Sequence, residues 1–157
     1  TPFETETVVR LAAHDRIVAV KDAKGDLDAS AWAMKRTDLA FYSGDDKVTL
    51  PLLSVGGVGV VGVPTHLFGV ETGRMIEAYQ RGDVVGALAL HRQLLPVFTG
   101  FFRTQGVITT KAALAMAGLP GGPVRPPLID ATPEQAVQLR ADFVDAGFAG
   151  FAGTHAS

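Results

Sequence analysis

The chain has 157 residues, of which 47% are hydrophobic and 19% are charged, and this balance excludes an intrinsically disordered protein. With 14 basic and 16 acidic residues and no block of like charge, the sequence lacks the basic patch that nucleic acids and anionic membranes attract. The absence of cysteine excludes disulfides and thiolate metal sites, and it suits a cytoplasmic location. We therefore expect one globular protein whose partners are small molecules or copies of itself.

The first half of the chain alternates short apolar runs with segments of helical period. Runs rich in β-branched residues predict strands, and apolar residues three or four positions apart predict helices. In chain order, the pattern predicts a helix over 4–12, a strand over 17–23, a helix over 26–35, a strand over 39–43, a helix over 47–55, a strand over 58–63 and a helix over 65–80. Strands that alternate with helices pair in parallel through right-handed crossovers, so the expected class is α/β.

From Gly82 on, the pattern predicts helices alone. They span 84–102, 107–117 and 133–146. Thr132, Pro133 and Gln135 form a capping box with proline at the first helical position, which marks the start of the last helix. We expect an α/β part over 1–81, a helical part over 82–157, and a loosely held tail from Gly147.

Residues 49–70 carry no formal charge over a length that can cross a bilayer. Pro51, Pro64 and closely spaced glycines interrupt this segment, so we expect a helix, a turn and a buried strand there rather than a membrane span. Three parallel strands cannot close into a barrel and would leave two unpaired edges. The sheet is therefore expected to continue on the N-terminal side.

Lys21 is the first candidate for chemistry because it stands at the end of the apolar run 17–23, which predicts a fully buried strand. A cation at that position loses hydration, which favours the neutral amine that forms Schiff bases with carbonyl substrates. The alternative is that the strand ends there and Lys21 points into solvent.

Four motifs stand in a fixed order along the chain. Residues 20–26 read (I/V)-K-(E/D)-A-x-G-(D/N), residues 43–51 read S-G-D-D-x-x-x-L-P, residues 56–63 are close to G-G-x-G-(V/F)-I-S-V, and residues 124–128 match (V/L)-R-(L/P)-P-L. In these motifs the chain resembles the lysine-dependent pyruvate aldolases and lyases, the superfamily of dihydrodipicolinate synthase and N-acetylneuraminate lyase. The second motif is typical of the dihydrodipicolinate synthase branch. The resemblance extends over residues 3–147.

The resemblance implies a (β/α)₈ TIM barrel, of which this chain supplies strands six to eight as a partial barrel over 1–81 and a C-terminal helical bundle over 82–157. The N-terminal half-barrel would then be missing from this chain. Lys21 would form the Schiff base, the backbone at Gly44 would approach the bound substrate, and Val61 would form an apolar wall against the pyruvate-derived carbon. All three positions fall at the carboxyl ends of strands, where the active sites of such barrels lie.

The implied activity is a class I aldolase reaction, in which pyruvate condenses with aspartate semialdehyde to give 4-hydroxy-tetrahydrodipicolinate for lysine and diaminopimelate biosynthesis. The resemblance also implies a homo-oligomer, a tetramer or a dimer, and no cofactor. We expect this chain to be a C-terminal fragment that is inactive alone, because the family's remaining active-site hydroxyls and its carboxylate-binding arginine come from strands two to five. We assign no metal to His14, His91 and His155, because no carboxylate or histidine stands at ligand spacing from them.

Two departures from the family pattern stand after the third strand. Gly62 replaces the usual serine, and His66 stands where it can line the entrance to the site or serve a structural role. Asp45 and Asp46 belong to the second motif, but they can also simply cap the next helix.

Three alternatives remain open at this point. The first is another pyruvate-dependent aldolase of the superfamily, acting on N-acetylneuraminate or a keto-deoxy sugar acid. The second is a non-catalytic half-barrel that assembles with itself or with a partner chain. The third is a flavodoxin-like binding module, against which stands the lack of a glycine-rich phosphate loop after any strand.

Overall fold

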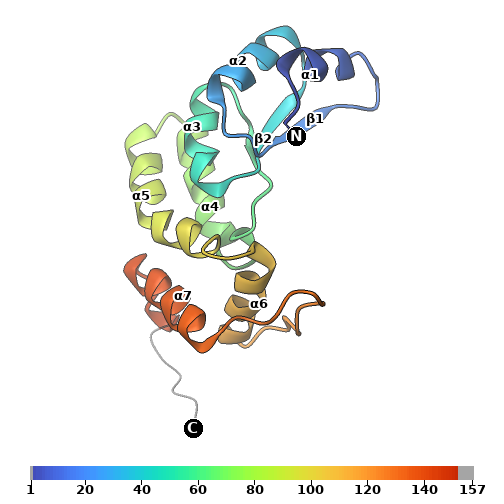
Figure 1. Ribbon diagram of the computed structural model, residues 1–157. Helices are drawn as coiled ribbons and strands as arrows, with labels where there is room; N and C mark the ends of the chain where they lie inside the picture. Colours follow the sequence, from blue (N-terminus) through green and yellow to red (C-terminus); the bar gives the residue numbers. More distant parts are fainter. Residues whose placement is uncertain (1, 152–157) are drawn as a thin grey trace.

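The computed structural model describes residues 2–151, which follow the predicted order of strands and helices. The first half contains α1 (Thr5–Leu11), β1 (Ala19–Asp22), α2 (Leu27–Arg36), β2 (Ala40–Ser43), the 3₁₀ helix η1 (Asp46–Val48), α3 (Thr49–Ser54), β3 (Gly59–Val60) and α4 (Thr65–Gln80). The second half contains α5 (Val84–Gly100), α6 (Gly106–Met116), α7 (Pro133–Asp145) and the 3₁₀ helix η2 (Ala149–Phe151). The molecule is elongated, with α1 and α2 at one end and α7 at the other (Figure 1).

The three strands form one parallel sheet in the order β1-β2-β3, as predicted. The register pairs Lys21 with Tyr42 and Ser43 with Val60. Each strand is shorter than its apolar run, because only part of each run finds a neighbour with which to form ladder hydrogen bonds. The carboxyl ends of all three strands meet at one edge of the sheet.

Helices cover one face of this sheet. Phe41 packs there against Ala33 of α2, and Val8 of α1 and Val20 of β1 pack against them. The opposite face of β1, which carries Lys21, is exposed, and Val18 just before the strand is 70% exposed. The prediction of a fully buried first strand is therefore wrong for this chain, because among residues 2–151 β1 lies at an edge of the sheet and has helices on one face only.

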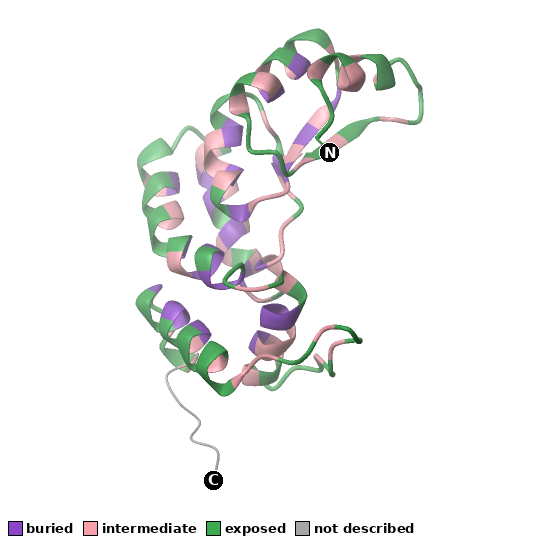
Figure 2. Ribbon diagram, in the orientation of Figure 1, coloured by how far each residue is buried: buried purple, intermediate pink, exposed green. Residues whose placement is uncertain are grey.

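The larger core lies between the helices of the second half, and Figure 2 shows buried residues on the facing sides of α4, α5, α6 and α7. Its centre is a group of aromatic rings. The ring centroid of Phe68, in α4, lies 5.0 Å from that of Phe143, in α7, and 6.2 Å from that of Phe101, which follows α5. Such edge-to-face and tilted pairs add to the hydrophobic stabilisation that burial provides. The aromatic core therefore holds the helical half together.

Two details of the second half bear on the predictions. The capping box is confirmed, because the Thr132 hydroxyl accepts from the Gln135 N–H and the Gln135 side chain accepts from the Thr132 N–H. The prediction of a loose tail is wrong as far as η2, since Phe148 and Phe151 pack against the aromatic core. Residues 152–157 lie outside the described part of the chain.

The uncharged stretch 49–70 forms α3, a turn, β3 and the start of α4, as predicted. Among residues 2–151, no helix combines the length and the apolar character that crossing a bilayer requires.

Candidate active site

The carboxyl ends of the three strands bring Lys21, Gly44 and Val61 to one edge of the sheet. Lys21 lies within β1, and the other two residues directly follow β2 and β3. The Gly44 N–H donates to the Asp22 carbonyl at 2.7 Å, and the Val61 N–H donates to the Ser43 carbonyl at 2.8 Å. These two hydrogen bonds extend the ladder by one residue on each side of β2, so the three predicted site residues stand on adjacent backbones.

Gly44 lies directly against the Lys21 side chain. An ideal Cβ atom at residue 44 would lie 3.0 Å from Cε of Lys21 and 2.9 Å from Cβ of Ala23. Both distances are shorter than ordinary carbon–carbon contacts, so only glycine fits here without displacing the lysine side chain. Gly44 therefore forms one side of the space that the Lys21 side chain occupies.

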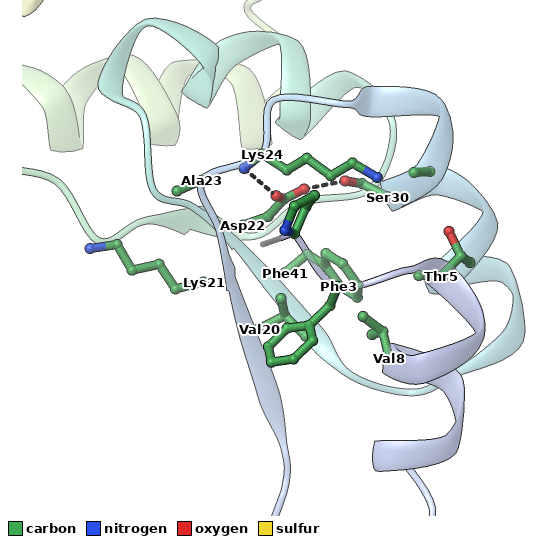
Figure 3. Close-up of a pocket in the computed structure, with 13 residues that line it drawn as sticks. Phe3, Thr5, Val8, Val20, Lys21, Asp22, Ala23, Lys24, Ser30 and Phe41 are labelled. Atoms are coloured by element: carbon green, nitrogen blue, oxygen red, sulfur yellow. Dashed lines mark hydrogen bonds between the residues drawn. The ribbon is translucent and has the colours of Figure 1, made fainter.

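Lys21 and Asp22 project to opposite sides of β1, as successive residues of a strand do (Figure 3). The Asp22 carboxylate accepts from the Lys24 N–H at 2.8 Å and from the Ser30 hydroxyl, which ties β1 to α2. A cleft of about 360 Å³ lies on this helical side and is bordered by Phe3 and Val8 of the N-terminal segment. The amine of Lys21 points away from that cleft (Figure 3).

Lys21 is exposed in this chain, and Val61, which follows β3, is 47% exposed. Of the two interpretations that the sequence left open, an amine partly withdrawn from water and a side chain in solvent, this chain shows the second. This exposure arises because the face of the sheet that carries Lys21 has no covering element in the described residues. Any shielding of this amine must come from protein outside them.

The two aspartates after Gly44 have different environments. Asp45 accepts from the Lys47 N–H at 3.1 Å and thus caps η1, as one of the two interpretations predicted. Asp46 is completely buried, and burial raises the pKa of its carboxyl, an effect that the neighbouring Asp45 charge increases and the Lys21 charge opposes. The sequence could not separate these roles, because two adjacent aspartates carry the same local signal.

Tyr42 is a residue that the sequence reasoning did not single out. Its register with Lys21 places both side chains on the uncovered face, and its ring lies 3.3 Å from the position of a Cβ on Gly59. The alternation of side chains along a strand predicts which residues of β2 share a face. The register that puts Tyr42 beside Lys21 depends on long-range pairing, which a single sequence does not reveal.

The histidines do not gather at this edge in the part of the chain that is described. His66 is exposed in the first turn of α4, and the proposal that it lines the site entrance stays a prediction. Burial lowers the pKa of His91 in α5. Within residues 2–151 no three histidine, aspartate or glutamate side chains cluster as metal ligands would, and His155 lies outside this range.

Comparison with known proteins identifies the same family along almost the whole chain. The model of the dihydrodipicolinate synthetase family matches residues 2–146. The 4-hydroxy-tetrahydrodipicolinate synthase of Acidothermus cellulolyticus is 74% identical over 152 residues, which are 97% of this chain and 49% of that protein. The second such synthase of Streptomyces coelicolor is 57% identical over 146 residues, covering 93% of this chain and 49% of its own length.

The solved structures give the same result for the fold. The dihydrodipicolinate synthase of Cyanidioschyzon merolae, crystallised with lysine bound, superposes with a TM-score of 0.90 at 41% identity. The superposition covers 94% of this chain and 51% of that one. The chain therefore spans about half the length of the relatives it matches and forms part of their TIM-barrel fold. By sequence and by fold, the chain belongs to the dihydrodipicolinate synthetase family.

Proposed function

We propose that the protein to which this chain belongs condenses pyruvate with aspartate semialdehyde to 4-hydroxy-tetrahydrodipicolinate, as a Schiff-base-forming lyase of lysine and diaminopimelate biosynthesis. The observation that carries the proposal is the contact between Gly44 and the Lys21 side chain at the carboxyl ends of two adjacent strands. This is the edge of a TIM barrel at which active sites lie. The names of the relatives support the choice of reaction within the family.

In the proposed mechanism, the neutral Lys21 amine adds to the ketone carbon of pyruvate, and loss of water leaves an iminium ion. The methyl group next to the iminium carbon then loses a proton. The electron pair of that C–H bond moves towards the iminium nitrogen, and an enamine forms. The enamine carbon then forms a bond to the aldehyde carbon of aspartate semialdehyde, whose oxygen takes up a proton and becomes a hydroxyl group, while the enamine nitrogen becomes an iminium again. The amine of that substrate finally attacks the imine carbon, closes the ring and releases Lys21.

Gly44 and Val61 hold the pyruvate-derived part of the intermediate in this proposal. The backbone at Gly44 has no side chain between it and the substrate, and the exposed Val61 side chain supplies an apolar surface beside it. Correct placement of bound reactants accounts for several orders of magnitude in rate. Small changes at either residue should therefore lower the catalytic rate.

We further propose that β1, β2 and β3 are strands six, seven and eight of the barrel, that residues 1–81 complete its C-terminal part and that residues 82–157 form an appended helical domain. The share of the relatives that the chain covers supports this assignment. The other five strands would then supply the remaining proton-transfer and carboxylate-binding groups. This chain alone should bind pyruvate poorly and turn over no substrate, and the whole protein is proposed to be a cytoplasmic homo-oligomer.

Turnover by the full-length protein tests the proposed function. Wild type should consume pyruvate and aspartate semialdehyde together, and Lys21→Ala should abolish this consumption. Lys24→Ala is the matched control, since it removes an exposed amine three residues away whose partner is Asp26 at 3.4 Å. Cleavage of N-acetylneuraminate by the wild type without the condensation would contradict the proposed substrate and indicate another lyase of the superfamily.

A further inference from the structure

Asp46 is a buried carboxyl at the candidate site that the mechanism above does not use. It begins η1, two residues after Gly44, and no part of it reaches solvent. One of its oxygens, Oδ1, has no hydrogen-bond partner within the described residues. A buried acceptor without a partner costs free energy, so its presence here calls for a physical reason.

The other oxygen of Asp46 joins the ends of two strands. Oδ2 accepts from the Val63 N–H at 3.2 Å. The backbone ladder between β2 and β3 ends earlier, at the hydrogen bond from the Val61 N–H to the Ser43 carbonyl. The Asp46 side chain therefore continues the connection two residues past the ladder, where the two strands would otherwise be free to separate.

Gly62 leaves the space that the Asp46 carboxyl occupies. An ideal Cβ atom at residue 62 would overlap Oδ1 of Asp46 and approach its Cγ to 2.9 Å. Any residue other than glycine would thus push the carboxyl away from the Val63 N–H. Asp46 and Gly62 therefore form one unit, because the Asp46 carboxyl occupies the space that a side chain at residue 62 would fill.

The groups that this unit holds are those of the proposed site. Gly44 is anchored to β1 by its hydrogen bond to the Asp22 carbonyl, whereas Val61 lies between β3 and Gly62, so a separation of the two strand ends moves Val61 away from Gly44 and from the Lys21 amine. From these contacts we propose that Asp46, admitted by Gly62, is a positioning residue that fixes Val61 relative to Gly44 and the Lys21 amine. This inference rests on the proposed function, because it concerns the pyruvate-binding wall of that site.

The test compares Asp46→Ala, Gly62→Ala and Asp46→Asn in the full-length enzyme. The first two should raise KM for pyruvate about tenfold and lower kcat less, because the binding wall moves while the amine stays on β1. Asp46→Asn should restore KM to within about twofold of wild type, since its amide oxygen can still accept from the Val63 N–H. A residue that only stabilises the fold would change the melting temperature without this split between KM and kcat.

The chain supplies a matched control pair at the start of α5. Asp83 accepts from the Gly86 N–H at 2.8 Å, and a Cβ on Gly86 would overlap the Asp83 carboxyl just as one on Gly62 would overlap Asp46. Asp83→Ala and Gly86→Ala should lower the melting temperature and leave KM for pyruvate unchanged.

Each outcome decides one question. If both the Asp46→Ala and the Gly62→Ala enzymes keep the wild-type KM, the positioning role is wrong although the proposed function stands. Should Asp46→Ala fail to fold, Gly62→Ala and its comparison with Asp46→Asn give the answer. If the wild type itself shows no pyruvate-dependent borohydride labelling, the proposed function fails, and the positioning role fails with it.

Discussion

A Cβ atom on Gly44 would lie 3.0 Å from Cε of Lys21, so the glycine after the second strand and the lysine of the first strand share one small space. The N–H of Gly44 is anchored by its hydrogen bond to the Asp22 carbonyl, and the backbone there cannot easily retreat. The position of the Lys21 amine is therefore coupled to the absence of a side chain at residue 44.

Gly44→Ala should displace the Lys21 amine and lower kcat/KM for pyruvate about a hundredfold in the full-length enzyme. The added methyl group would meet Lys21 Cε and Ala23 Cβ at once, and misplacement of a reacting group by about 1 Å costs this much. Steady-state kinetics at varied pyruvate concentration measure the effect.

Gly73→Ala is the control for that substitution. Gly73 lies within α4, and in the described part of the chain nothing outside its own helix backbone stands within 4 Å of its Cβ position. Alanine there should keep wild-type kinetics and stabilise the protein by about 0.5–1 kcal/mol, because glycine is a poor helix former. Equal kinetics for Gly44→Ala and Gly73→Ala would show that the Lys21 amine does not depend on its contact with residue 44.

Arg103→Leu should destabilise the helical half by about 2 kcal/mol. The guanidinium donates two hydrogen bonds to Asp142, at 2.8 and 2.7 Å, which join the end of α5 to α7, and the Asp142 side chain is only 7% exposed. Removing the cation leaves that carboxylate buried and unpaired, although the exposure of Arg103 moderates the cost. Urea denaturation measures the change in the free energy of unfolding.

Arg81→Leu provides the comparison for this ion pair. Arg81 and Glu77 are each about two-thirds exposed and 3.7 Å apart, and such surface pairs contribute less than about 0.5 kcal/mol. The account of the α5–α7 ion pair would be wrong if both arginine variants unfolded at the same urea concentration.

The stability of the protein should depend on pH through Asp46. Burial raises the pKa of this carboxyl above its ordinary value of 3.8, so the folded state holds the proton more tightly than the unfolded state. The stabilisation from the protonated form is complete below about pH 4 and is lost as pH rises through the raised pKa of the folded state.

Asp46→Asn removes this titration and keeps the shape of the side chain. The free energy of unfolding of wild type should therefore fall relative to that of Asp46→Asn as the pH rises from about 4 towards neutrality. Chemical denaturation of both proteins at a series of pH values measures the difference. A difference that stays constant, or that grows in favour of wild type, would mean that the carboxyl is not raised in pKa.

Much of the fold could be predicted because its signals are local. Asp26 caps α2 by accepting from the Ala29 N–H, and the Thr132 box begins α7, both within a few residues of the sequence pattern that predicted them. The alternation of strands and helices then dictated a parallel sheet. The predicted residues Lys21 and Gly44 meet because consecutive parallel strands end at the same edge.

The rest depends on contacts between distant residues. The exposed face of β1 could not be predicted from its apolar composition, because such a composition is typical of a strand that is covered on both faces. The same holds for Phe148 and Phe151, whose glycine-rich surroundings suggested a loose tail although their rings find the aromatic core. The different environments of Asp45 and Asp46 follow from the course of the chain after β3, because Val63, 17 residues after Asp46, places its N–H beside only one of the two carboxyls.

Borohydride reduction of the full-length protein in the presence of pyruvate tests the central claim most directly, because it captures the iminium ion as a stable amine on the residue that formed it. We expect the mass increase of one reduced pyruvate on the peptide that contains Lys21, and no increase in Lys21→Ala. Label on another lysine, or undiminished labelling of the Lys21→Ala protein, would contradict the assignment of the Schiff base to Lys21.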